Sequence, residues 1–320
     1  MKIVTLQGGG LWFPEGTSQG ASAVDELFFL ILGISGFFFV LIVASMVFFA
    51  LRYGQRRRPQ PERSPAHNLA LELAWSVLPA VLLGYMFVEG YRSYLELRTP
   101  PDDAYEIQAI AQRWSWSFIY PNGHVSGELH VPVDRPVEVV LTSEDVIHSF
   151  FVRAFRVKMD AVPGRYSKAW FVAERPGSYE VQCAEYCGTG HSAMNAALVV
   201  HPPGGFEAWL EEASNLLDRL PPVEAGKELY HQRGCVQCHS VDGSPRSGPT
   251  FLGLYGSQRE LESGERVLAD ENYVRESILA PQAKVARGWP PVMPTYKGRI
   301  KDGEIGAVIA YLKTLEGGNP

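Results

Sequence analysis

Residues 183–194 read Cys183-Ala184-Glu185-Tyr186-Cys187-Gly188-Thr189-Gly190-His191-Ser192-Ala193-Met194. Two thiols, an imidazole and a thioether fall within this short stretch. Soft sulfur together with imidazole is a ligand set that suits copper. A surface loop closed by a disulfide is the plain alternative, but it leaves the spacing of the histidine and the methionine unexplained. The stretch therefore predicts a dinuclear copper centre that transfers electrons.

Such a centre needs a second imidazole from elsewhere in the chain. His148 is the best candidate, because it follows a predicted strand and an aromatic pair comes soon after it. The other histidines of the region are expected to be ordinary surface or strand residues: His124, His130 and His201. A structural zinc site would not need Met194, and a mononuclear blue-copper site needs only one thiolate. The predicted copper ligands are His148, Cys183, Cys187, His191 and Met194.

The composition limits the classes of function. The chain has 320 residues, enough for two or three compact units, and a net charge of −6. A mildly acidic chain argues against nucleic acid as a partner and is compatible with a basic protein partner. The four cysteines form two close pairs, 183/187 and 235/238, so a structural disulfide framework is not expected.

Two apolar segments predict a two-helix transmembrane hairpin over residues 24–98. A helix of about 25–52 contains the charge-free run 27–51, which spans about 37 Å. The second helix, about 69–95, carries Pro79, which is expected to kink it. Five arginines between the helices predict a cytoplasmic loop, with the N-terminus and everything after residue 96 outside. Residues 1–23 are expected to be an N-terminal outer segment without a signal-peptide pattern.

Glu72 stands near the cytoplasmic end of the second helix. An ionisable residue at a membrane boundary is usually solvated among the headgroups. It becomes a candidate for a proton pathway when its helix packs against a partner. Both interpretations are open from the residues alone.

Residues 99–202 predict an all-β domain. Short β-like runs at 106–111, 137–142, 169–173, 179–183 and 197–200 are separated by turns rich in Pro, Gly and Asn. This spacing is typical of a β-sandwich or barrel. A scaffold of this kind holds its loops rigidly, as an electron-transfer site requires.

The rest of the chain predicts a linker, 203–223, and a small helical domain, 224–320. Cys235-Val236-Gln237-Cys238-His239 is the Cys-x-x-Cys-His signal for covalent c-type haem, with His239 placed to bind the iron. A thioredoxin-like Cys-x-x-Cys would need a βαβ context, which this region lacks. Met293 is the only methionine after residue 203 and lies in a proline-rich loop, so it is the predicted sixth ligand. His231 is the rival ligand.

The copper stretch resembles the dinuclear copper motif of subunit 2 of haem-copper cytochrome c oxidases. The motif is Cys-x-Glu-x-Cys-x3-His-x2-Met with an upstream histidine. The hairpin ahead of a β domain matches too, so the resemblance covers about residues 24–202. It implies a cupredoxin-like sandwich. It also implies that Glu185 binds copper through its backbone carbonyl and a Mg²⁺ ion, at the interface with subunit 1, through its carboxylate.

Two further segments are similar to that family. Residues 113–118, Arg-Trp-Ser-Trp-Ser-Phe, resemble its aromatic stretch, which makes Trp114 the point where electrons enter. Trp116 is either part of this stretch or a core residue. The family usually has Gln and Tyr at positions 113 and 115, where this chain has Arg and Ser, and this difference bears on external docking. Residues 72–79 resemble the family's second helix, whose glutamate opens a proton channel, so the resemblance favours that role for Glu72.

The C-terminal domain resembles a class I, all-α cytochrome c. In that family a proline carbonyl, here that of Pro249, accepts a hydrogen bond from the iron-binding histidine. Together the three parts resemble subunit 2 of a caa-type oxidase, in which a cytochrome c domain is fused to the copper subunit.

These features predict an electron-transfer subunit that passes electrons from its haem to its copper centre and on to subunit 1. Subunit 1 would reduce O₂ to water with proton pumping, and this chain alone would not. The expected partners are subunit 1, subunit 3, the lipid bilayer and an upstream cytochrome or bc-type complex. The expected location is the bacterial inner membrane, with both termini and both redox domains on the periplasmic side.

Two alternatives are open. The electron-accepting subunit of a copper-containing nitric oxide reductase would have the same modules and a different catalytic partner. A membrane-anchored copper-delivery protein would bind one exchangeable Cu(I) and would have little use for a haem.

Overall fold

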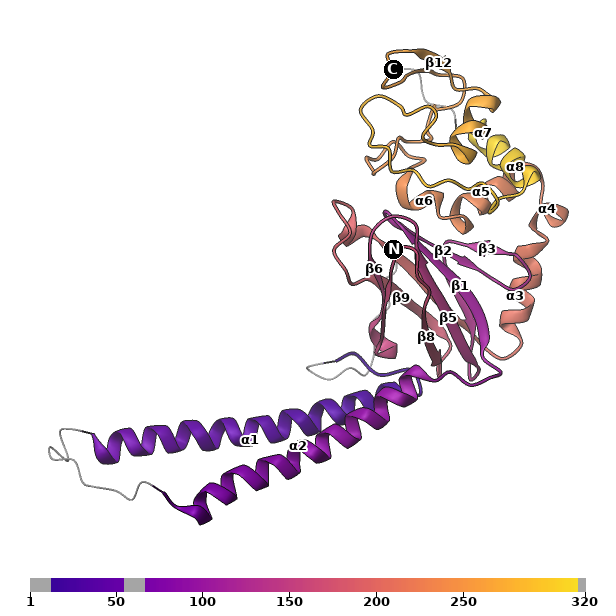
Figure 1. The fold of residues 1–320 in the computed structure, drawn as a ribbon. Coiled ribbons are helices and arrows are strands. Elements are labelled where there is room, and N and C mark those ends of the chain that lie inside the picture. The colour runs from indigo at the N-terminus through magenta and orange to yellow at the C-terminus, as the bar shows by residue number, and fades with distance from the viewer. Residues whose placement is uncertain (1–12, 55–66, 316–320) are drawn as a thin grey trace. The chain divides into compact units, whose positions relative to one another are not determined.

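The computed structural model describes residues 13–54 and 67–315 (Figure 1). The chain divides into two units, one of residues 20–99 and one of the remainder. The predictions for residues 1–12 and for the arginine-rich loop at 55–66 lie outside the described residues. The predicted multidomain fold, a transmembrane hairpin, a cupredoxin-like β-sandwich and a cytochrome c domain, is confirmed.

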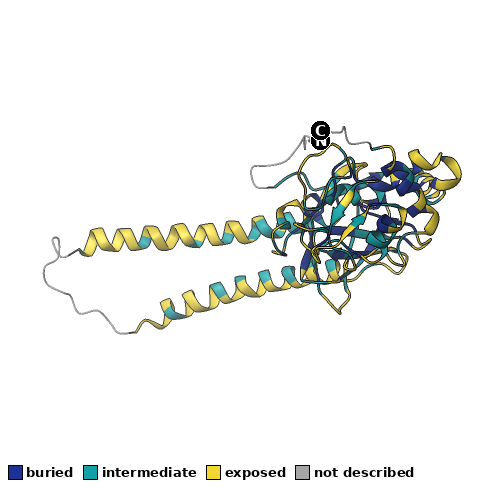
Figure 2. Cartoon of the chain, turned by 90° about the horizontal axis from the view of Figure 1, so that it is seen from above, coloured by how far each residue is buried: buried dark blue, intermediate teal, exposed yellow. Residues whose placement is uncertain are grey.

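Helices α1 (Ala21–Tyr53) and α2 (Leu69–Arg98) form the membrane unit, and each extends beyond its predicted range. Both are long and apolar enough to cross a membrane. Their large apolar side chains are exposed, for example Phe39 at 68% and Phe87 at 71% (Figure 2). An apolar surface of this extent is unfavourable in water and is typical of a membrane-facing surface. The described helices are therefore consistent with a bilayer anchor.

Two reciprocal hydrogen bonds cap the N-terminus of α2. The side-chain oxygen of Asn68 accepts a hydrogen bond from the Leu71 amide at 3.2 Å. The Glu72 carboxylate accepts one from the Asn68 amide at 3.0 Å. These bonds satisfy amides that would otherwise lack partners in the first turn of the helix. Pro79 lies inside the helix, as the sequence predicts.

Ten strands form the β domain as two five-stranded sheets, in the orders β3-β2-β1-β5-β8 and β4-β10-β9-β6-β7. The pairs β1–β5 and β4–β10 are parallel, and the other pairs are antiparallel. The strands are β1 (Tyr105–Gln112), β2 (Ser115–Ile119), β3 (Val125–Ser126), β4 (Leu129–Pro132), β5 (Pro136–Ser143), β6 (His148–Val152), β7 (Val157–Ala161), β8 (Ser167–Val172), β9 (Gly177–Cys183) and β10 (Asn195–His201).

Alternate residues of the strands fill the core between the sheets. On β1 the residues Ile107, Ala109 and Ala111 are fully buried. On β5 the same holds for Val137, Val139 and Leu141. Burying one large aliphatic side chain contributes about 1.5–3 kcal/mol. A one-residue slip would turn these side chains to the solvent, so the register that positions the loops is well determined.

Residues 13–19 also belong to the β domain, and we call them the N-terminal strap. The Thr17 amide donates to the Ala154 carbonyl at 3.0 Å, and the Glu174 amide donates to the Thr17 carbonyl at 2.9 Å. The buried Ser18 hydroxyl donates to the Phe155 carbonyl at 2.9 Å. The strap therefore packs on the domain immediately before α1 begins.

The C-terminal domain is mostly helical. Its elements, with those of the linker, are α3 (Gly205–Ser214), α4 (Leu216–Arg219), α5 (Pro222–Gln232), α6 (Cys235–Cys238), β11 (Gln258–Glu260), β12 (Arg266–Leu268), α7 (Glu271–Leu279) and α8 (Asp302–Leu312). The β11–β12 hairpin is an addition to the predicted all-α fold. Helices α5 and α8 cross at Gly226, where a Cβ atom would overlap the Ala307 carbonyl. Glycine is thus required at this crossing.

Candidate functional site

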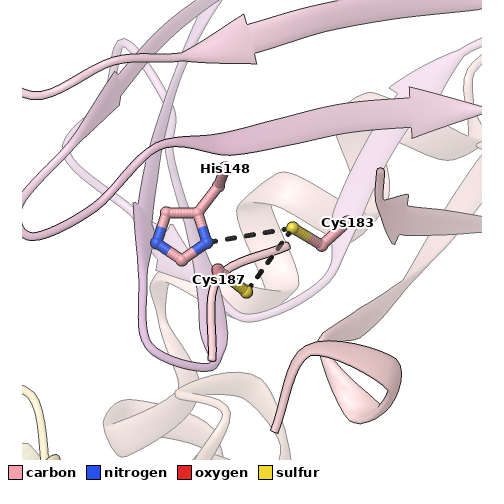
Figure 3. Close-up of side chains that lie close together, drawn as sticks. All are labelled: His148, Cys183 and Cys187. Atoms are coloured by element: carbon pink, nitrogen blue, oxygen red, sulfur yellow. Dashed lines mark hydrogen bonds between the residues drawn. The ribbon is translucent and has the colours of Figure 1, made fainter. Parts of the chain in front are cut away.

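The start of β6 and the end of β9 bring sulfur and imidazole together. Phe150 of β6 pairs with Cys183, the last residue of β9. His148 lies two residues before Phe150 and therefore on the same face of the strand. Its Nδ1 is 3.8 Å from Cys183 Sγ, which is in turn 3.8 Å from Cys187 Sγ (Figure 3). The three ligand atoms all lie within 4.8 Å of one another, as a metal site requires.

The loop after β9 brings the remaining predicted ligands to the same place. Cys187 Sγ lies 3.5 Å from His191 Nδ1 and 3.8 Å from Met194 Sδ. The Glu185 carbonyl oxygen lies 3.3 Å from Cys183 Sγ, and the Glu185 side chain is exposed. The Cys183 amide donates to the Met194 carbonyl at 3.2 Å, which closes the loop. All six residues predicted to bind copper are thus neighbours.

The cluster is shielded from water. His148 and Met194 are fully buried, and Cys183 and Cys187 are almost fully buried. Neither cysteine forms a disulfide. Burial alone would raise the pKa of the Cys183 thiol, but hydrogen bonds with His148 and with backbone groups lower it to about 6. Burial and the neighbouring Cys183 raise the pKa of Cys187 to about 12. The two pKa values shift in opposite directions because the sulfurs lie close together, and a metal binding both sulfurs would displace any proton that they hold.

The donor set fits copper. Two thiols, a thioether and two imidazoles are soft or intermediate ligands, whereas Mg²⁺ and Ca²⁺ prefer oxygen. The dry, rigid surroundings also restrict geometric change at the site. The cluster can therefore hold copper and exchange electrons without opening a position for a substrate.

Trp114 packs directly against the copper loop. Its Nε1 donates to the Cys187 carbonyl at 3.3 Å. A Cβ atom at Gly190 would overlap the indole ring, and one at Gly188, where φ is +118°, would lie 3.2 Å from it. Trp116 is instead a core residue, with its ring 5.9 Å from that of Phe150 between centroids. Of the two tryptophans, Trp114 is the one in contact with the loop.

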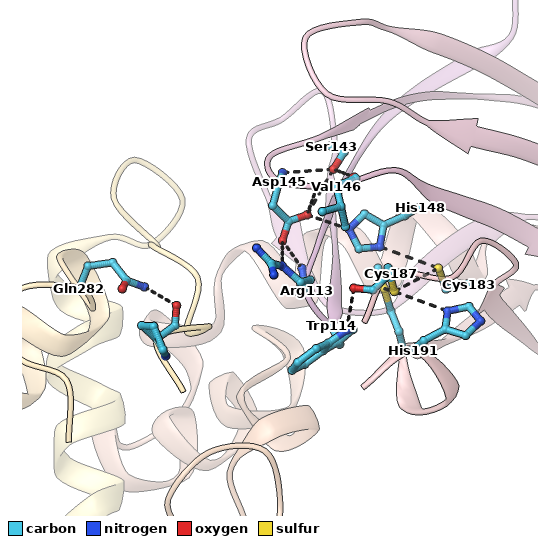
Figure 4. Close-up of polar contacts among 12 residues, drawn as sticks. Arg113, Trp114, Ser143, Asp145, Val146, His148, Cys183, Cys187, His191 and Gln282 are labelled. Atoms are coloured by element: carbon cyan, nitrogen blue, oxygen red, sulfur yellow. Dashed lines mark hydrogen bonds and ion pairs between the residues drawn. The ribbon is translucent and has the colours of Figure 1, made fainter. Parts of the chain in front are cut away.

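Asp145, which the sequence did not single out, and Arg113, which it noted only for external docking, complete the surroundings of His148. Asp145 Oδ1 lies 2.8 Å from His148 Nε2. Asp145 Oδ2 accepts from the Arg113 backbone amide at 2.8 Å and from its Nε at 3.1 Å (Figure 4). Burial opposes ionisation, but the bonds from His148 and Arg113 hold the pKa of Asp145 well below its usual range. An aspartate three residues before a candidate ligand is the signal that could have indicated this contact.

The three other histidines of the β domain gather around Trp209 of α3. The ring of His130 stacks on Trp209 at 3.8 Å between centroids, and its Nδ1 is 2.9 Å from His201 Nε2. His124 contacts Trp209 edge-on, and burial lowers the pKa of His124 to about 3. The structure thus gives these residues packing contacts with a linker helix.

A second set of ligands lines a pocket of the C-terminal domain. Cys235 and Cys238 lie on α6, and His239 directly follows. His239 Nδ1 is 2.7 Å from the Pro249 carbonyl, which confirms the predicted hydrogen bond. Since this bond takes the Nδ1 proton, Nε2 is left as the ligand atom. Burial disfavours the charged form of each group, so it lowers the pKa of His239 and raises that of Cys235 to about 12.

Met293 lines the same pocket as His239. Gln282 Nε2 donates to the Pro291 carbonyl at 3.0 Å and so holds the loop that carries Met293 (Figure 4). The other lining residues are mainly apolar and include Phe251, Ile278, Val285, Trp289, Ile300 and Leu312. His231, the rival ligand, is exposed on α5. Two thiols, an imidazole and a thioether around an apolar pocket fit a c-type haem.

Comparisons with known proteins agree with this arrangement. Family models for the transmembrane and the periplasmic domain of cytochrome c oxidase subunit II match residues 7–89 and 124–201. The cytochrome c model matches residues 223–316. Cytochrome c oxidase subunit 2 of Alkalihalophilus pseudofirmus is 31% identical over 301 residues, which cover 90% of this chain and 86% of that protein.

Two further similar proteins come from Bradyrhizobium. Alternative cytochrome c oxidase subunit 2 of Bradyrhizobium diazoefficiens is 31% identical and covers 63% of this chain and 83% of its own length. The crystal structure of the periplasmic domain of subunit II of cytochrome oxidase from Bradyrhizobium japonicum is 34% identical, with a TM-score of 0.35. It covers 37% of this chain and 98% of that chain.

Proposed function

The chain belongs to the cytochrome c oxidase subunit II family, and from this we propose how its residues carry electrons into the oxidase. It is a membrane-anchored subunit with a periplasmic domain, it binds copper and haem c, and it associates with the catalytic subunit 1. The bound copper and haem each supply a one-electron redox couple. The chain passes electrons from its haem domain to its copper domain and on to subunit 1, which reduces O₂ to water.

The sulfurs of Cys183 and Cys187 would hold copper in a dinuclear centre, which would supply a one-electron redox couple. The observation that carries this proposal is the convergence of His148, Cys183, Cys187, His191 and Met194 in one cluster, in which all but the half-buried His191 are buried. The His148 and His191 rings each lie beside a different sulfur, at 3.8 and 3.5 Å, so both imidazoles would help to hold the copper. The Glu185 carbonyl completes the set, and its exposed carboxylate is the proposed ligand of Mg²⁺ at the interface with subunit 1.

The haem domain holds its haem covalently through Cys235 and Cys238. His239 and Met293, which line the same pocket, would hold the haem iron. The hydrogen bond to Pro249 orients His239, and the held loop presents Met293. With an imidazole and a thioether both supplied by the chain, the haem would serve electron transfer and would not bind a substrate.

Three further roles complete the proposal. Trp114 is the point where electrons enter the copper domain, and its contact with the Cys187 carbonyl supports this role. Glu72 opens a proton channel into subunit 1, and the contact with Asn68 gives it a second, capping role. Subunit 3 and an upstream cytochrome or bc-type complex are the proposed partners. Both termini and both redox domains lie on the periplasmic side of the bacterial inner membrane.

The two alternatives are less well supported. A copper-delivery protein needs an exchangeable site, whereas His148 and Met194 are fully buried. Such a protein also has little use for the haem pocket. The relatives are cytochrome c oxidase subunits, which favours O₂ over NO as the acceptor of the complex.

Metal analysis of the purified chain tests the proposal. Two copper ions per chain with a mixed-valence EPR spectrum, together with one covalent haem, are expected. Cys187→Ser should abolish or strongly alter the copper spectrum and leave the haem in place. One labile Cu(I), or an unchanged spectrum in Cys187→Ser, would contradict the assignment of the centre.

A further inference from the structure

We propose that Asp145 and Arg113 act as a charged pair that positions the imidazole of His148 and sets the reduction potential of the copper centre. The inference rests on the proposed function, because it requires copper at His148. Asp145 contacts His148 and Arg113 contacts Asp145, so both are positioning residues that act through the histidine.

The two nitrogens of His148 face different partners. Nδ1 points to Cys183 Sγ at 3.8 Å, and Nε2 lies 2.8 Å from Asp145 Oδ1. An ionised carboxylate only accepts hydrogen bonds, so Nε2 must carry the proton. The lone pair of the neutral ring is then on Nδ1, directed at the metal site. Asp145 thereby selects both the tautomer and the orientation that a copper ligand needs.

Asp145 is itself held on both oxygens. Oδ1 accepts from the Val146 amide at 2.7 Å, in addition to its contact with His148. Oδ2 accepts from the Arg113 amide at 2.8 Å and from Arg113 Nε at 3.1 Å. The carboxylate therefore cannot rotate away from His148 without breaking bonds to two segments of the chain (Figure 4).

Arg113 also connects the two halves of the site. It directly precedes Trp114, whose indole donates to the Cys187 carbonyl at 3.3 Å. Arg113 thus contacts Asp145 beside His148, and the next residue, Trp114, contacts the sulfur loop. A side-chain substitution at Arg113 keeps the backbone amide bond to Asp145 and removes only the charge and the bond from Nε.

The pair has a predictable electrostatic effect. A carboxylate at Nε2 makes the imidazole a stronger donor at Nδ1, and this favours the more positively charged, oxidised centre. The Arg113 guanidinium withdraws part of that negative charge. Removing the cation should therefore lower the potential, and neutralising the carboxylate should raise it. A purely structural role of either residue would not produce shifts of opposite sign.

Redox titration of the purified oxidase complex, followed by the copper EPR signal, tests the proposal. Asp145→Asn should raise the potential and weaken copper binding by about 10- to 100-fold, because the second partner of a ligating histidine is altered. Arg113→Gln should lower the potential and retain copper, and Arg113→Lys should restore part of the shift. Lys158→Gln is the matched control, because Lys158 forms an exposed ion pair with Asp160 at 3.0 Å on β7.

Two outcomes would overturn the inference: potentials equal to that of the control, or shifts of the same sign in both variants. Where Asp145→Asn does not assemble, Arg113→Gln decides alone, since the Arg113 side chain is 44% exposed and its loss leaves the core intact. A wild-type complex without two copper ions would instead contradict the proposed function. The two failures are therefore distinguishable.

Discussion

Gly190→Ala is a minimal perturbation of the contact between the copper loop and Trp114. Gly190 has φ −88°, a value that alanine adopts freely, so the substitution adds no backbone strain. The added methyl group would overlap the indole ring of Trp114. The ring cannot move aside without losing the hydrogen bond from its Nε1 to the Cys187 carbonyl. The whole effect is therefore a steric one between two residues.

Two contributions set the loss of stability: the overlap of the methyl group with the indole, and the hydrogen bond that the indole loses. Overpacking in a well-packed site costs about 1–3 kcal/mol. The lost hydrogen bond adds about 1 kcal/mol. A loss of about 2–4 kcal/mol in a domain of about 100 residues lowers Tm by at least about 8 °C. The displaced indole should also slow the reduction of copper by an external donor.

Thermal loss of the copper EPR signal measures the stability, and a double-mutant cycle isolates the contact. In a Trp114→Ala background the indole is absent, so the added methyl group has nothing to overlap. Gly190→Ala should then lower the free energy of unfolding by less than about 0.5 kcal/mol. An equal cost of Gly190→Ala in both backgrounds would refute the reasoning, since the effect would then come from somewhere other than the indole.

Three other predictions concern single groups. Met293→Ala should leave the haem covalently attached and lower its potential, as seen by redox titration; no shift would point to another axial ligand. His124 stays neutral in the folded protein down to about pH 3, whereas its unfolded pKa is about 6.5, so stability falls as pH falls below 6.5. Between pH 6.5 and 5 the free energy of unfolding should fall by about 2 kcal/mol, and melting curves of His124→Asn should show no such fall. A variant whose stability still falls as much as that of the wild type would contradict this assignment to His124. Glu72→Gln keeps an acceptor for the Asn68 amide and should slow proton-coupled turnover without affecting copper reduction, so normal turnover would leave Glu72 with its capping role only.

The sequence predicts those parts of the molecule that are encoded locally. Five of the six predicted copper ligands fall within residues 183–194, and Cys235, Cys238 and His239 are close neighbours in the chain. The hairpin is predictable because its apolar runs are long. The strands with clear apolar patterns, β1, β5, β8, β9 and β10, were predicted, whereas β2, β3, β4, β6 and β7 have at most five residues each. Such short strands depend on their partners more than on their own residues.

Contacts between distant segments were not predictable in this way. Arg113 and Asp145 meet because β1 and β5 are parallel neighbours and both end at the same edge of the sheet. Nothing in the local sequence around either residue specifies that pairing. Similarly, residues 1–23 carry no apolar alternation, and the strap is ordered by backbone hydrogen bonds to β8 and to residues 154 and 174.

The strap has a consequence for biosynthesis. Ser18 bonds to Phe155, 137 residues later, so the β domain is assembled from pieces made before and after the membrane helices. The hairpin is, in effect, an insertion into a periplasmic domain. In the proposed orientation, with both termini on the periplasmic side, the first piece can pair with the domain only after both helices have been inserted and the strands have been translocated. After a single cut between α1 and α2, the fragment with α2 would still contain the β domain. The fragment with α1 would stay bound to that domain through the strap.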